Sequence, residues 1–229
     1  MLPLRDNVPT RGFPVVTVTL IAANFAVWIL YELPNLNRSI LDSGYFPCEP
    51  AGECIAPGNP WWVDAFTSIF MHGGWEHILG NMLFLWIFGN NVEDTMGRVR
   101  FIIFYLLGGL AATASQSFVT LEFGATADAR IPNVGASGAI AAVLAAYLVL
   151  FPRGRVLTWV IPFFFFELPA LVFLGLWFVL QLFLGSQSFV QPESGGGGAF
   201  FAHIGGFLFG LVLVRVFTAG RPKPVRPAY

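Results

Sequence analysis

Residues 133–151 read NVGASGAIAAVLAAYLVLF, a serine between two glycines followed by a run of small and apolar residues. It lies within an uncharged segment, 131–152, that contains no Asp, Glu, Lys or Arg. A helix from Ser137 to Phe151 would be about 22 Å long, shorter than the roughly 30 Å hydrocarbon core of a bilayer. The serine would then lie below the membrane surface, and the loop 131–136 would have to dip inward. Irregular backbone at that depth is tolerated only beside protein or a water-filled cavity.

The composition places most of the chain in lipid. Only 11% of the 229 residues are charged, compared with about 25% in soluble globular domains. Hydrophobic residues make up 56%, 25 residues are Phe, and the mean hydropathy is +0.70. These values exclude an ordinary cytosolic enzyme, a disordered segment and a nucleic-acid-binding protein. The net charge of −1 does not indicate any particular partner. The sequence has no phosphate-binding loop motif for a nucleotide. We expect no cofactor.

The uncharged stretches predict an all-α membrane protein with a bundle of six transmembrane helices. A spanning helix needs about 20 apolar residues. Six uncharged stretches have about this length: 13–31, 77–92, 101–121, 131–152, 168–185 and 194–214. A seventh span would need residues 156–166, which are too few to cross alone, and Pro162 and Pro169 break this region.

The Lys and Arg residues predict the orientation. With the N-terminus in the cytoplasm and six spans, only Arg38 and Arg130 of the 12 cations lie outside. We therefore expect a multi-pass protein of the plasma (inner) membrane with both termini cytoplasmic. The expected organisation is a cytoplasmic N-terminus (1–12), a membrane domain (13–217) with an extracytoplasmic loop (34–64), and a basic, proline-rich, disordered tail (218–229).

The extracytoplasmic loop contains both cysteines of the chain. A disulfide between Cys48 and Cys54 is plausible because that compartment is oxidising. Two free thiols are the alternative. A metal site is not expected, because no histidine lies near the cysteines in sequence.

Polar residues inside a membrane are costly and are functional candidates by default. His77 and Asn81 are four residues apart, so they share one face of the second span. His72 and His77 are five residues apart, which argues against a paired-histidine metal site on one helix. Hydrogen bonds that hold the bundle together are the alternative explanation.

Two further polar residues lie at the starts of spans. Ser137 would begin its helix, where the helix dipole favours a developing anion, although a serine there also serves as a simple N-cap. His203 lies three residues before Gly206, and Gly206 and Gly210 form a GxxxG motif that permits close helix packing. Gly138 and the alanines that follow it present a small-residue face to receive that helix. Ser137 and His203 are therefore expected at matching depths.

Nucleophilic catalysis needs a hydroxyl, a base within hydrogen-bond reach, and donors for the oxyanion. The serine, the histidine and the His77–Asn81 pair would supply all three. All three histidines of the chain lie at the outer ends of predicted spans, a coincidence that structural hydrogen bonds would not require.

These residues resemble the rhomboid family of intramembrane serine proteases. The similarity extends over residues 66–210 and rests on four motifs in order. They are His72-x4-His77-x3-Asn81, Gly89-x3-Glu93-x3-Gly97, Gly135-Ala-Ser137-Gly138, and Ala202-His203-Ile-Gly205-Gly206. The GxSG motif alone is weak, but the set in separate spans is highly specific.

The resemblance implies a serine endopeptidase that cleaves the transmembrane segments of membrane protein substrates. It implies Ser137 as the nucleophile and His203 as the general base, without a third acidic residue. It also implies that His77, Asn81 and the Ser137 backbone N–H bind the oxyanion. His72 and the glycines of the motifs (Gly135, Gly138 and Gly206) would have supporting roles, and Glu93 would brace the loop between the second and third spans.

The sequence departs from the family at one point. Members often carry a Trp-Arg pair before the Phe66-Thr67 position, whereas this chain has Trp61-Trp62 nearby and no arginine. Interfacial tryptophans could anchor the first loop instead.

Two other functions remain open. A catalytically inactive rhomboid relative could bind membrane proteins, but such relatives lose the serine or the histidine. A transporter with a histidine proton path would need carboxylates at mid-span, and only Glu167 intrudes, near a predicted cytoplasmic end.

Overall fold

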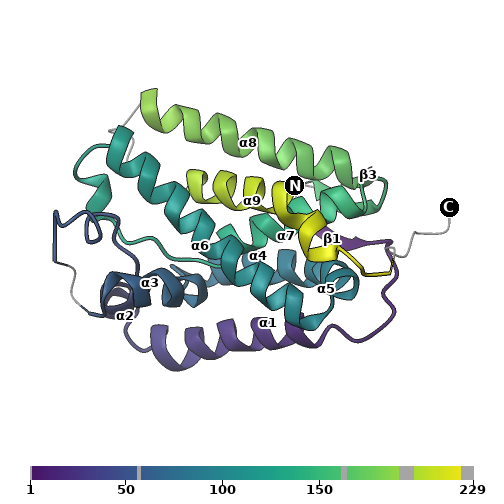
Figure 1. The fold of residues 1–229 in the computed structure, drawn as a ribbon, viewed down its shortest axis with the longest axis horizontal. Coiled ribbons are helices and arrows are strands. Elements are labelled where there is room, and N and C mark those ends of the chain that lie inside the picture. Colours follow the sequence, from purple (N-terminus) through teal and green to yellow (C-terminus); the bar gives the residue numbers. More distant parts are fainter. Residues whose placement is uncertain (1, 56–57, 161–163, 191–198, 223–229) are drawn as a thin grey trace.

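The computed structural model describes residues 2–55, 58–160, 164–190 and 199–222. These residues form a mostly helical bundle (Figure 1). The helices are α1 (Val15–Val27), α2 (Leu36–Ser43), α3 (Trp61–Thr67), α4 (Trp75–Phe84), α5 (Asn90–Met96), α6 (Arg98–Phe123), α7 (Ser137–Leu150), α8 (Ala170–Val190) and α9 (Phe200–Thr218). Two π-helical turns, η1 (Trp28–Glu32) and η3 (Leu85–Gly89), extend α1 and join α4 to α5, and two 3₁₀ turns are η2 (Ser68–Phe70) and η4 (Asp128–Arg130).

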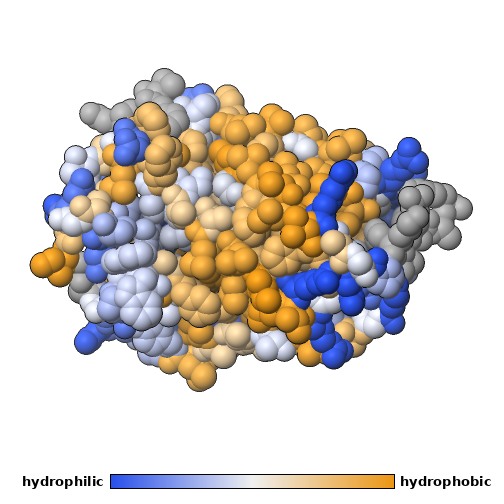
Figure 2. Space-filling view, in the orientation of Figure 1, coloured by the Kyte–Doolittle hydropathy of each residue, from blue (hydrophilic) through white to orange (hydrophobic). Residues whose placement is uncertain are grey.

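Four helical segments are long and apolar enough to cross a membrane. They are Val15–Glu32, Arg98–Phe123, Ala170–Gln187 and Phe200–Thr218. The other two predicted spans correspond to the continuous helical run through α4, η3 and α5, and to the shorter apolar helix α7. Hydrophobic side chains form a belt across the middle of the visible face, with hydrophilic residues toward both ends (Figure 2). The chain is therefore an integral membrane protein.

Helix α7 forms the centre of the bundle. All ten residues from Gly138 to Tyr147 are buried, so this helix has no lipid-facing stripe. Glycines of the neighbouring helices permit close approach: a Cβ on Gly108 would meet Ala142, and one on Gly210 would overlap the Ala142 carbonyl. Small residues at such contacts allow van der Waals packing of helices in lipid.

The all-α prediction is correct for most of the chain but misses a small sheet. Strands β1 (Leu2–Asp6), β2 (Arg155–Val160) and β3 (Phe164–Pro169) pair in that order, both times antiparallel. The segment 156–166 is too short to cross a bilayer as a helix, and its strands satisfy backbone polar groups through ladder hydrogen bonds instead.

The starts of the fifth and sixth predicted spans can be compared with the structure only in part. Because β3 continues to Pro169, the fifth apolar helix begins at Ala170 rather than at residue 168. The described part of the sixth begins at Phe200, whereas the stretch predicted from residue 194 starts among undescribed residues. Most of the tail expected to be disordered, 223–229, also lies outside the described residues.

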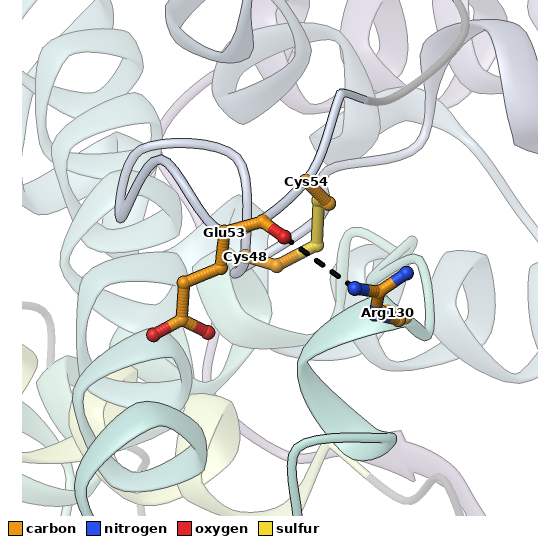
Figure 3. The surroundings of a disulfide bond; sticks show 4 residues. All are labelled: Cys48, Glu53, Cys54 and Arg130. Atoms are coloured by element: carbon orange, nitrogen blue, oxygen red, sulfur yellow. Dashed lines mark hydrogen bonds between the residues drawn. A yellow bond between two sulfur atoms is a disulfide. The ribbon is translucent and has the colours of Figure 1, made fainter.

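The loop after α2 is held to the segment that leads into α7. Cys48 and Cys54 form a disulfide, and Arg130 donates a hydrogen bond to the Glu53 carbonyl at 3.4 Å (Figure 3). The Cys48 N–H donates to the carbonyl of Ala129 at 3.0 Å. The cross-linked loop therefore supports the backbone just before Ser137.

Candidate active site

Ser137 and His203 are in hydrogen-bond contact. The Ser137 Oγ and the His203 Nε2 are 2.8 Å apart. The contact depends on a close crossing of α7 and α9, where a Cβ on Gly206 would overlap the carbonyl of Gly138. His203 lies one helical turn before Gly206, so the crossing delivers its ring to the first residue of α7.

The loop before α7 places His77 next to the serine. Gly135 has φ +132°, a left-handed conformation that favours glycine. A Cβ on Gly135 would lie 2.8 Å from the His77 Nε2 and 3.5 Å from the Ser137 Oγ. The two side chains therefore approach the same point from different sides, and only a glycine leaves that point open.

A hydrogen bond to the His77 Nδ1 determines which nitrogen of the neutral ring carries the proton. The Gly73 N–H donates a hydrogen bond to the His77 Nδ1 at 3.2 Å. A neutral imidazole carries one N–H and one acceptor nitrogen. The His77 Nε2 therefore carries the proton and acts as a donor beside Gly135.

Asn81 lies one helical turn after His77 on α4. Its side chain is buried, with 8% exposed, and its Nδ2 has no hydrogen-bond partner among the described residues. A buried donor without a partner costs about 1–3 kcal/mol. Asn81 therefore has a donor group available on the same helix as His77, and the first N–H groups of α7 have no intrahelical partner.

His72 contacts His77 from the segment that leads into α4. Its ring is buried and packs edge-on against the His77 ring, with 5.1 Å between centroids. Its backbone N–H donates to the Glu32 carboxylate at 2.7 Å. This arrangement fits a supporting role.

Glu93 lies on α5, just before the loop that it is expected to brace, and its carboxylate contacts the start of α1. Its carboxylate accepts hydrogen bonds from the backbone N–H groups of Val16 and Thr17 at 2.9 and 2.8 Å, and from the Thr17 hydroxyl at 2.8 Å. Glu93 thus caps the first turn of α1, where the N–H groups have no intrahelical partner.

Two residues of α8 touch His203 and were not predicted. The Gln181 Oε1 lies 2.8 Å from the His203 Nδ1. The Trp177 ring lies 5.8 Å from the His203 ring, between centroids. Gln181 is the one amide side chain between residues 170 and 186. That isolation was available in the sequence, but it does not reveal which helix the amide faces.

A small cavity adjoins the serine. Its volume is about 30 Å³, room for about one water molecule. Polar groups contribute to its lining, among them Ser68, Gln116, Asn133 and Ser137. Among the described residues, no group of three or more His, Cys, Asp or Glu could hold a metal ion.

Comparison with known proteins agrees with the resemblance in the motifs. A family model described as "Rhomboid domain" matches residues 59–220. "Presenilin-associated rhomboid-like protein, mitochondrial" of Bos taurus is 32% identical over 200 residues, which cover 85% of this chain and 47% of that protein. The Homo sapiens protein of the same name is 32% identical over 201 residues, covering 85% and 46%.

A more distant relative is "Rhomboid protein 1, mitochondrial" of Saccharomyces cerevisiae. It is 29% identical over 150 residues, which cover 62% of this chain and 38% of that protein. The chain spans about half the length of the mammalian relatives. Since the family model covers most of the chain, and covers the residues around Ser137 and His203, the chain belongs to the rhomboid family.

Proposed function

We propose that the chain is an intramembrane serine endopeptidase that cleaves transmembrane segments of membrane protein substrates. The observation that carries the proposal is the 2.8 Å contact between the Ser137 Oγ and the His203 Nε2 within an apolar helical bundle. A serine hydroxyl is a poor nucleophile at neutral pH and needs an adjacent base. The bundle supplies that base from a second helix.

The reaction proceeds through an acyl-enzyme. The His203 Nε2 takes the proton of the Ser137 hydroxyl as Oγ attacks the scissile carbonyl. The same imidazolium then gives this proton to the leaving amine when the peptide bond breaks. A water molecule, activated by His203 in turn, attacks the acyl carbon and releases the second product together with the free serine.

The donors around the serine stabilise the tetrahedral intermediates. The proposed oxyanion site consists of the His77 Nε2–H, the Asn81 Nδ2–H and the Ser137 backbone N–H. The absence of a described partner for the Asn81 Nδ2 supports this role, since preorganised donors need no rearrangement when the charge develops.

We also propose the six-span arrangement in the plasma (inner) membrane, with both termini on the cytoplasmic side. The asymmetry of Lys and Arg residues supports it. The placement of the termini on one side is supported by the fold, since β1, β3 and the end of α9 lie at the end of the bundle away from α2 and α3 (Figure 1). In this arrangement Ser137 lies toward the extracytoplasmic side, which also holds the loop with the Cys48–Cys54 disulfide.

The alternative, an inactive relative that binds membrane proteins, differs in one measurable respect. Both proteins would bind a transmembrane partner, but only the protease would cut it. Ser137 and His203 in hydrogen-bond contact favour the protease, because a protein that only binds has no need for an activated hydroxyl.

The test uses purified protein in detergent with a model transmembrane substrate. We expect the wild type to cleave the substrate and to react with a fluorophosphonate at Ser137, and Ser137→Ala to do neither. Ser186→Ala, which changes an exposed serine on α8, is the matched control and should behave like the wild type. Cleavage that persists in folded Ser137→Ala would exclude the serine mechanism.

A further inference from the structure

One amide side chain on α8 is buried against the proposed active site. Gln181 stands in an otherwise apolar run, ALVFLGLWFVLQLFLG, which covers residues 170–185. Most of its neighbours on α8 face outward, but Gln181 itself is only 7% exposed. Burying an amide in an apolar bundle is unfavourable unless it is hydrogen-bonded, so its partner indicates what it does.

That partner is the nitrogen of His203 that does not face the serine. The His203 Nδ1 lies 2.8 Å from the Gln181 Oε1, while the His203 Nε2 lies 2.8 Å from the Ser137 Oγ. Ser137, His203 and Gln181 therefore form a continuous line of hydrogen bonds that draws one residue from each of α7, α9 and α8.

The amide oxygen selects one tautomer of the imidazole. A carbonyl oxygen accepts hydrogen bonds and cannot donate them, so the His203 Nδ1 must carry the proton. The Nε2 is then left with its lone pair directed at the Ser137 hydroxyl. This is the only neutral tautomer in which His203 can take the proton of the serine.

Contacts on both sides of Gln181 hold α8 in register with α9. One turn earlier, Trp177 lies against His203 itself, and Phe178 stacks on Phe207 with 4.4 Å between ring centroids. One turn later, a Cβ on Gly185 would lie 3.3 Å from the Phe201 ring, a close approach of the two helices. The amide is thus presented from a segment that is packed against α9 at several points.

We propose that Gln181 is a positioning residue that holds His203 in the proton-accepting tautomer and orientation, and so completes a Ser–His–Gln line of hydrogen bonds. The inference rests on the proposed function above and deepens it. When the His203 Nε2 takes the serine proton, the Nδ1–H remains bonded to the amide oxygen, which stays unprotonated. A neutral amide supplies orientation without burying a second charge in the bilayer, where a carboxylate would be costly.

Three variants separate positioning from packing. Gln181→Met keeps the length of the side chain and removes the acceptor, whereas Gln181→Glu keeps an acceptor oxygen. Gln187→Met makes the same change at an exposed position of the same helix. Comparison of melting temperatures in detergent identifies any variant that fails to fold.

We expect Gln181→Met to lower kcat by about 10- to 100-fold with little change in KM, less than the roughly 10⁴-fold loss when a catalytic histidine is held in the wrong tautomer. Gln181→Glu should recover most of this loss and move the acid limb of the pH profile of kcat/KM to higher pH, because a carboxylate favours the imidazolium. Gln187→Met should match the wild type. A Gln181→Met enzyme with kcat within about twofold of the wild type would overturn the proposal.

A spectroscopic measurement tests the same point without substrate. In protein labelled with ¹⁵N-histidine, the His203 signals are identified by their loss in His203→Ala. We expect the wild type to have a protonated Nδ1 and an unprotonated Nε2, and Gln181→Met to show a mixture of tautomers. A wild-type His203 protonated at Nε2, or an unchanged tautomer in Gln181→Met, contradicts the inference. If the wild type cleaves no substrate, the proposed function fails, yet the tautomer measurement still decides the role of Gln181.

Discussion

The two ends of α7 differ in how their polar groups are satisfied. At its N-terminal end, the Ser137 hydroxyl contacts the His203 Nε2 at 2.8 Å, and the Asn81 Nδ2, which we propose as an oxyanion donor, has no partner among the described residues. At its C-terminal end, the Tyr147 hydroxyl donates to the Asp6 carboxylate at 2.6 Å and so ties α7 to the sheet. In the proposed function, the first end leaves donors unsatisfied for chemistry, whereas the second end uses its polar groups to join α7 to the sheet. Substitutions at the two ends should therefore separate activity from stability.

The largest effect is expected from Ser137 and His203. Removing either should lower cleavage by at least about 10³-fold, and the double variant should be no slower than either single variant, because residues that act as a unit are non-additive. Fluorophosphonate labelling should collapse in His203→Ala while the melting temperature stays close to that of the wild type. Labelling at the full rate in His203→Ala would assign the base to another residue.

The next effect concerns the helix crossing that brings the pair together. In Gly206→Ala, the new Cβ would overlap the Gly138 carbonyl, so α9 must move away from α7. We expect a loss of about 1–3 kcal/mol of stability together with a strong loss of activity, since His203 moves with α9. Gly175→Ala is the control, because a Cβ there meets nothing within 4 Å. Equal behaviour of the two variants would contradict the close crossing.

The sequence predicts the proposed pair better than its surroundings. The glycine spacing of α9 and the small residues after Ser137 indicate which helices cross, and the structure brings their side chains within 2.8 Å. The sheet escapes prediction because β1 and β2 lie far apart in the chain and each is short. Gln181 also escapes, because an isolated amide on an apolar helix does not reveal the rotation of that helix relative to α9.

A moderate effect on activity alone is expected for Asn81→Ala. Loss of one oxyanion donor costs about 10²–10³-fold in rate, and we expect the lower part of that range or less because His77 and the backbone N–H remain. Stability should hold or rise slightly, since a buried donor without a described partner is removed. Cleavage assays and thermal melts of the same preparation give both values. Unchanged turnover in the folded variant would remove Asn81 from the site.

The smallest effect is expected at the opposite end of α7, in the pH dependence of stability. Burial raises the pKa of Asp6 to about 6 from its ordinary value of 3.8, although the Tyr147 hydroxyl donates a hydrogen bond to its carboxylate. The folded protein therefore holds the Asp6 proton more tightly than the unfolded chain does. The resulting stabilisation is complete below about pH 4 and is lost as the pH rises through about 6.

Asp6→Asn tests this expectation, because an amide does not titrate. The melting temperature of the wild type, measured in detergent from pH 4 to 7, should decline relative to that of Asp6→Asn by the equivalent of about 1–2 kcal/mol. Cleavage measured at one pH should change little, since the contact lies at the end of α7 away from Ser137. Parallel melting curves for the two proteins would show that Asp6 does not titrate in this range. A large loss of cleavage in Asp6→Asn would show instead that the two ends of α7 are coupled.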